Sequence, residues 1–105
     1  MRASYRFTSW KSWDRRLDEA VRTFIRDHGA PPNLLVASAG TLRRISIAAA
    51  SKRPGRRFRA LTGFVGGDYQ LSFIPEEDLP DNTFSLILAV DEAELEEEEV
   101  LTVPV

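Results

Sequence analysis

The chain has 105 residues, 43% of them hydrophobic, which suffices for the core of one domain, and we expect a single domain over residues 1–105. It contains no cysteine, which excludes disulfides, thiolate metal sites and a cysteine nucleophile. No apolar stretch approaches the roughly 18 to 20 residues of a membrane span, and no apolar segment typical of a secretion signal follows Arg2 and Arg6. We therefore expect a cytoplasmic protein with no membrane partner.

Positive and negative charges occupy different parts of the sequence. All fourteen Lys and Arg lie within residues 1–59, together with four carboxylates, whereas residues 60–105 hold twelve Asp and Glu and no cation. Such an asymmetry indicates binding to a polyanion or to a charged protein partner, together with an acidic tail. It identifies neither a reaction nor a ligand.

The first predicted element is an amphipathic helix over residues 13–28. Its apolar side chains recur at the spacing of one helical face, namely Trp13, Leu17, Ala20, Val21, Phe24 and Ile25. Ser12 is the expected N-cap, and Gly29, followed by two prolines, is the expected stop.

A buried strand and a second helix follow. The short apolar run at residues 33–37 is bounded by turn formers and is typical of a buried strand. Apolar residues then recur at helical spacing from Leu42 to about Ser51, with Ser38 or Thr41 as the expected cap.

The rest of the chain has the pattern of strands. Residues 58–65 and 69–75 flank two glycines and an aspartate at 66–68 and are predicted to form a hairpin. Residues 84–90 are almost wholly apolar, as in a central strand. Residues 100–105 are either a last edge strand or a frayed tail, and Pro104 favours an edge.

The predicted order of elements is therefore α-β-α-β-β-β. It indicates an α/β (α+β) fold, a two-layer sandwich with two helices on one face of a mainly antiparallel sheet of four or five strands. The acidic segment at residues 91–99 is a candidate for a flexible part of this domain.

The strongest functional signal is a cluster of cations between residues 43 and 59, a stretch without acidic residues. Phosphate backbones bind such clusters through counterion release and hydrogen bonds from arginine, independently of base sequence. The alternative is a solvated surface, or pairing with the chain's own acidic end. The candidate binding residues are Arg43, Arg44, Lys52, Arg53, Arg56, Arg57 and Arg59.

Aromatic residues alternate with cations near the N-terminus. Tyr5, Phe7, Trp10 and Trp13 lie among Arg2, Arg6, Lys11, Arg15 and Arg16, as on a surface that stacks single-stranded bases. Core packing is the favoured interpretation, because Trp13 belongs to the apolar face of the predicted helix and Phe7 and Trp10 precede its first turn.

Three further features have a structural and a functional interpretation. The turn at residues 38–41 precedes a helix and offers a place for a phosphate, but it lacks a nucleotide-binding fingerprint, so ordinary capping is favoured. His28, the only histidine, is expected to cap the first helix rather than to act as a base. The acidic run at residues 91–99 lacks the ligand spacing of a calcium loop and is expected to be solvated, or to compete with nucleic acid for the basic surface.

These patterns favour a small binding module over an enzyme, with no cofactor and no metal. Its partner is expected to be nucleic acid, through phosphates, or another acidic protein. The alternative is an assembly protein that forms head-to-tail homo-oligomers through opposed basic and acidic faces, with exposed strand edges adding main-chain pairing.

Overall fold

The computed structural model describes residues 1–51, 63–65, 69–89 and 102–105, and it contains two helices and six strands. The helices are α1 (Trp13–His28) and α2 (Ala39–Ser51). The strands are β1 (Arg2–Arg6), β2 (Leu34–Ala37), β3 (Gly63–Val65), β4 (Gln70–Pro75), β5 (Thr83–Ile87) and β6 (Thr102–Pro104).

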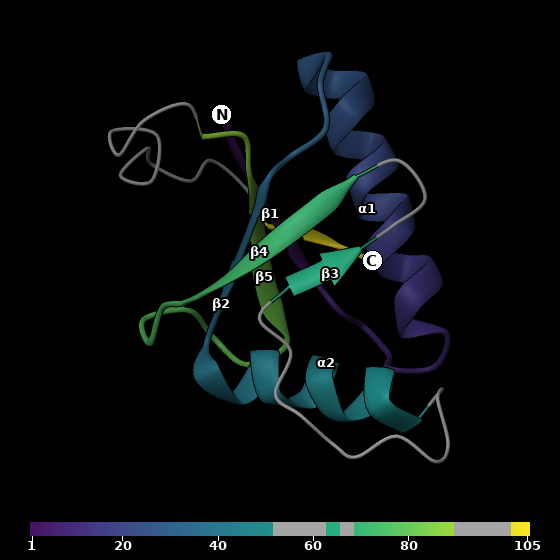
Figure 1. The fold of residues 1–105 in the computed structure, drawn as a ribbon, viewed down its shortest axis with the longest axis vertical. Coiled ribbons are helices and arrows are strands. Elements are labelled where there is room, and N and C mark those ends of the chain that lie inside the picture. Colours follow the sequence, from purple (N-terminus) through teal and green to yellow (C-terminus); the bar gives the residue numbers. More distant parts are fainter. Residues whose placement is uncertain (52–62, 66–68, 90–101) are drawn as a thin grey trace.

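The strands form one mixed sheet in the order β3-β4-β2-β5-β1-β6 (Figure 1). Strand pairs β3–β4, β2–β5 and β1–β5 are antiparallel, whereas β2–β4 and β1–β6 are parallel. The predicted α+β sandwich with a mainly antiparallel sheet is confirmed, with one strand more than the upper estimate.

The core lies between one face of the sheet and the two helices. Alternation along the strands turns Tyr5, Leu35, Leu71 and Phe84 to this face, where they are buried. The helices contribute Ile45 from α2 and the predicted apolar face of α1, in which Trp13, Leu17, Ala20, Val21 and Phe24 are buried. Helical periodicity therefore identified the core side of α1 correctly.

Strand β1 is the element that the sequence analysis missed. It lies between β5 and β6, and its residues alternate between the two faces of the sheet. Ser4, on the face away from the helices, is fully buried, and its hydroxyl lies 2.7 Å from that of Ser85 on β5. A strand that buries a hydroxyl pair on one face has no simple alternation of apolar and polar residues, so periodicity could not reveal it.

The ends of the helices agree only partly with the predicted caps. Gly29 terminates α1 with φ of 80°, and its N–H donates to the carbonyl of Ile25 at 2.7 Å. Ser38 caps α2, because its hydroxyl accepts the N–H of Thr41 at 3.2 Å. Ser12 is the N-cap of α1, as predicted, but its side chain makes no capping hydrogen bond.

The predicted hairpin is confirmed where the structure describes it, since β3 and β4 are antiparallel with Phe64 opposite Leu71. Residues 58–62 and 66–68 of that prediction lie outside the described residues, as does the acidic segment at residues 91–99. Residues 102–104 form the edge strand β6, which settles the choice between edge strand and frayed tail.

Candidate functional site

Only two of the seven predicted binding residues fall within the described part of the chain. Arg43 and Arg44 lie on α2 and are exposed. Lys52, Arg53, Arg56, Arg57 and Arg59 lie outside the described residues. The described cations therefore lie on α2 and in the N-terminal part of the chain.

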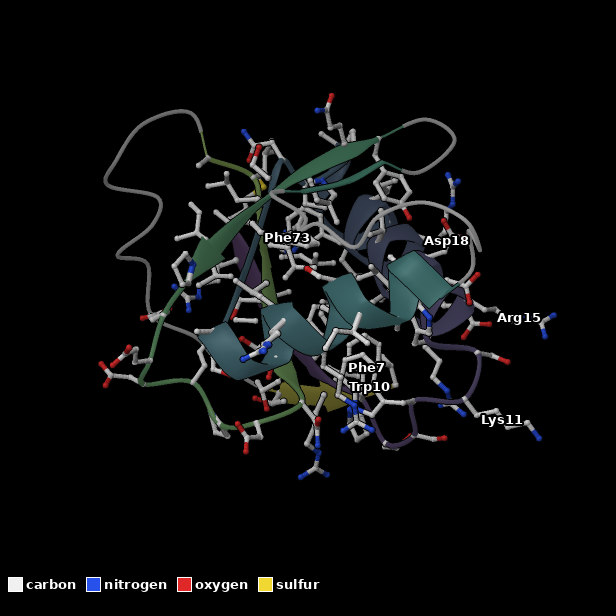
Figure 2. The ribbon with its side chains drawn as sticks, turned by 60° about the horizontal axis from the view of Figure 1, so that its bottom comes forward. Phe7, Trp10, Lys11, Arg15, Asp18 and Phe73 are labelled. Atoms are coloured by element: carbon white, nitrogen blue, oxygen red, sulfur yellow. The ribbon has the colours of Figure 1, made fainter. Side chains whose placement is uncertain are left out.

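Trp10 is the centre of a compact cluster beside α2. The ring centroids of Trp10 and Phe7 lie 4.5 Å apart, and the guanidinium carbon of Arg44 lies 4.4 Å from the centroid of the Trp10 ring. The indole N–H donates to Oδ1 of Asn82 at 2.9 Å. Figure 2 shows Phe7 and Trp10 side by side along α2. The loop between β1 and α1 is thus held in place by contacts with α2 and with the β4–β5 loop.

Asn82 connects three parts of the fold, a role for which the only local signal is its place among the turn formers Pro80, Asp81 and Asn82. Its N–H donates to the hydroxyl of Thr41 on α2 at 3.0 Å, and its carbonyl accepts the N–H of Phe7 at 2.8 Å. Its backbone has φ of 64°, in the left-handed region that asparagine tolerates better than most residues. The loops around Trp10 are consequently joined by main-chain bonds as well as by side chains.

Arg16, in the first turns of α1, fixes the same loop from the other side. Its Nε donates to the carbonyl of Lys11 at 3.0 Å, and its Nη1 donates to the hydroxyl of Thr8 at 3.2 Å. The guanidinium is therefore oriented by two neutral acceptors rather than by a carboxylate.

Five cations lie on this loop and on the two helices that contact it, and we call them the basic corner: Lys11, Arg15, Arg16, Arg43 and Arg44. Four are exposed and Arg16 is half-buried. None of the five forms an ion pair with a carboxylate within residues 1–51, 63–65, 69–89 and 102–105. Lys11 and Arg15 project away from the body of the molecule (Figure 2).

Three of the four other described arginines lie close to carboxylates, whereas Arg6 has no such partner among the described residues. Arg2 pairs with Glu76 at 3.1 Å, and its side chain is only 7% exposed. On α1, Arg22 approaches Asp18 at 3.7 Å and Arg26 approaches Asp27 at 3.4 Å. Arg6 is exposed at the end of β1, on the sheet face away from the helices.

The dipole of α1 adds to the positive potential of the basic corner. Lys11, Arg15 and Arg16 lie at the N-terminal end of this helix, where the dipole is positive and cations are unfavourable. Asp14 is the one acidic residue of the first turn. An arrangement of charges that opposes local helix stability is expected at a site that serves binding.

The N-terminus of α2 has a different character. A hollow of about 230 Å³ is lined there by Gly40, Thr41, Arg44, Asp81 and Asn82. Asp81 is exposed at its rim, and the Ser38 hydroxyl already accepts the N–H of Thr41. Ordinary capping, the favoured interpretation of this turn, is thus confirmed, and the carboxylate makes the hollow a poor place for a phosphate.

The N-terminal aromatic residues are structural. Tyr5, Phe7 and Trp13 are 2%, 4% and 6% exposed, and the contacts of Trp10 with Phe7 and Arg44 occupy its ring. Core packing is confirmed for Tyr5, Phe7 and Trp13, and Trp10 is partly buried against the same core.

His28 packs its ring against Phe24, with the centroids 4.4 Å apart, at the end of α1. Among the described residues there is no group of three or more side chains that could hold a metal ion. No helix in the described ranges is long and apolar enough to cross a membrane.

Comparison with protein-family models, with curated proteins and with solved structures found no match to this chain.

Proposed function

We propose that this protein is a small non-catalytic binding module that holds the phosphate backbone of a nucleic acid on the basic corner. The observation that supports it is the set of five cations on a well-fixed loop and on the two helices that contact it, without carboxylate partners among the described residues. Arg43 and Arg44 come from the cluster predicted from sequence, and Lys11, Arg15 and Arg16 extend it onto α1.

Phosphate is the favoured ligand chemistry because the cations are mostly arginine. The planar guanidinium forms two parallel hydrogen bonds with phosphate or carboxylate oxygens. A repeating polyanion gains further from the release of its condensed counterions, which a single carboxylate does not provide.

Recognition on this surface is expected to be independent of base sequence. The four N-terminal aromatic residues are buried or already in contact with other side chains, so they do not support a stacking platform for bases. Contacts with phosphates position a nucleic acid but carry no direct sequence information.

The experiment compares two double variants with the same change of charge. Lys11→Gln/Arg15→Gln removes two cations of the basic corner that make no described side-chain contact. Arg22→Gln/Arg26→Gln removes two cations of α1 that are paired with Asp18 and Asp27. Binding of fluorescently labelled duplex DNA, single-stranded DNA and RNA is measured by anisotropy between about 50 and 200 mM salt.

The variant of the basic corner is expected to make the slope of log K against log salt less negative, by up to about 1.8 for duplex DNA and about 1.4 for single strands. The control pair should leave the slope within error of the parent. Equal losses in both variants would show that net charge, not the basic corner, governs binding. No binding by the parent at low salt would refute the proposal.

The acidic segment at residues 91–99 is proposed to compete with the nucleic acid. Changing Glu96–Glu99 to glutamine should tighten binding at low salt, where the Debye length is about 30 Å at 0.01 M. The gain should disappear at about 1 M, where screening acts within about 3 Å. Unchanged affinity at low salt would remove this competitor from the proposal.

A further inference from the structure

Thr8 is hydrogen-bonded both to Val105, next to β6, and to Arg16 of the basic corner. The main-chain oxygen of Val105 accepts both the N–H of Thr8, at 2.9 Å, and its hydroxyl, at 2.6 Å. The same hydroxyl accepts Nη1 of Arg16 at 3.2 Å. Thr8 and Val105 are 97 positions apart in the sequence, and the hydroxyl oxygen of Thr8 joins both of them to Arg16 of the basic corner.

The direction of these bonds makes them interdependent. A threonine hydroxyl has one proton to donate, and Val105 receives it. The lone pairs of the oxygen are then available to Arg16, which can only donate. Donation to Val105 polarises the hydroxyl and strengthens it as an acceptor for the guanidinium.

Strand β6 is otherwise held mainly by its backbone. The side chains of Thr102, Val103 and Pro104 are all exposed, and the segment pairs in parallel with residues 4–6 of β1. The N–H of Val105 donates to the carbonyl of Arg6 at 2.8 Å, and its side chain packs at the margin of the core. Because so few side-chain contacts support it, β6 is one of the least secured strands and can respond to changes at Thr8.

We propose that Thr8 is a positioning residue that couples the docking of residues 102–105 on β1 to the orientation of Arg16 in the basic corner. This inference rests on the proposed function. With β6 docked, the hydroxyl of Thr8 is fixed and Arg16 is oriented before a phosphate arrives. With β6 released, the hydroxyl turns freely and the arginine loses one of its two described anchors.

The coupling must act in both directions, because linkage between two binding equilibria is reciprocal. A polyanion that binds better when Arg16 is oriented stabilises the docked form of β6 by the same factor. The prediction therefore has two readouts, the affinity for nucleic acid and the protection of the β6 amides.

The variants are Thr8→Val, which keeps the shape and the backbone N–H but removes the hydroxyl, and Thr8→Ser, which restores it. Thr23→Val, on α1, is the matched control for loss of a threonine hydroxyl. We expect Thr8→Val to weaken binding of labelled single-stranded DNA about two- to tenfold, the range that one hydrogen bond usually contributes. Thr8→Ser should recover most of this loss, and Thr23→Val should bind as the parent does.

Hydrogen–deuterium exchange at Val103 and Val105, whose amides face β1, supplies the second readout. Thr8→Val should raise amide exchange in β6, Thr8→Ser should reverse the increase, and single-stranded DNA should slow exchange there in the parent. Parent-like affinity of Thr8→Val, or DNA binding without added protection of β6, would overturn the coupling while leaving the proposed function intact. A parent that binds no nucleic acid would refute the proposed function, whereas the effect of Thr8 on exchange would still report the hydrogen-bonded link.

Discussion

The guanidinium carbon of Arg44 lies 4.4 Å from the centroid of the Trp10 ring. This contact joins α2 to the loop between β1 and α1, and it places an arginine with no carboxylate partner among the described residues over a fixed aromatic surface. Cation–π attraction leaves the positive charge intact, unlike an ion pair. The same contact thus stabilises the fold and keeps one charge of the basic corner available to a phosphate.

Adjacent arginines on α2 should separate stability from binding. Arg44→Ala removes the contact with Trp10 and should lower the free energy of unfolding by about 0.5 to 1 kcal/mol. Arg43→Ala removes an exposed side chain with no described contact and should change it by less than about 0.5 kcal/mol. Both should make the slope of log K for DNA against log salt less negative by up to about 0.9. Urea unfolding and anisotropy test this prediction, and equal stability of the two variants would contradict it.

Asn82 should tolerate glycine better than alanine. Its φ of 64° costs a residue with Cβ about 1 to 2 kcal/mol, while glycine adopts it freely. Both substitutions lose the bond from the Trp10 indole, worth about 1 kcal/mol. We therefore expect the Gly variant to be more stable than the Ala variant by about 1 kcal/mol in chemical unfolding. The opposite order would show that the backbone of this loop relaxes in the variants.

Tyr5 should make stability sensitive to alkaline pH. Burial raises the pKa of its phenol above the usual value near 10, the carboxylate of Asp27 raises this pKa further, and Arg26 opposes the shift. The folded protein then keeps the proton at a pH where the unfolded chain releases it. This contribution is complete below about pH 10 and is lost as pH rises toward the folded pKa.

The comparison for this prediction is Tyr5→Phe. The difference in unfolding free energy between parent and variant should be constant up to about pH 9 and should shift in favour of the variant above about pH 10. Urea unfolding at several pH values measures it. Parallel curves for the two proteins throughout this range would mean that Tyr5 titrates alike in both states.

Pro104 should protect the sheet from pairing with another molecule. Both the N–H and the main-chain oxygen of Val105 bond to the chain of β1 and the residues after it, so by alternation the backbone of Thr102 and Pro104 faces outward. Proline has no N–H there, which weakens the outer edge of β6 as a template. Pro104→Val supplies the missing donor and should increase association, measured by light scattering over a range of concentrations.

The matched control is Thr102→Val, which adds apolar surface to the same edge without adding a donor. If both variants associate equally, surface hydrophobicity and not the missing N–H limits pairing. Light scattering of the parent at low and high salt also tests the alternative of head-to-tail assembly through opposed charges. A parent that is monomeric at low salt removes that alternative.

The clearest agreement between sequence and structure concerns α1. Its apolar positions repeat at the helical period, and a single face of a surface helix is buried, so the pattern and the burial coincide from Trp13 to Phe24. Gly29 ends it as expected, because the left-handed backbone at a helix end is a local property. The β3–β4 hairpin was likewise predicted from turn chemistry between adjacent strands.

Strand β1 and the role of Asn82 could not be obtained in this way. Ser4 is buried because a hydroxyl from Ser85, 81 positions away, satisfies it. Asn82 matters because Trp10 and Thr41 come to it from other elements. Neither partner is visible in the local sequence, since hydrogen bonds between distant segments depend on how the strands are ordered in the sheet.

The sequence alone determined the helices, most of the strands and the separation of basic from acidic segments, because helical period, turn formation and charge are properties of neighbouring residues. Only the tertiary structure decided which cations remain without a carboxylate partner within the described chain. Arg2 pairs with Glu76, 74 positions away in the sequence, whereas Lys11 and Arg15 project from the surface. The physical reason is that ion pairing depends on distance in space, and that distance is set by the packing of α1, α2 and the sheet.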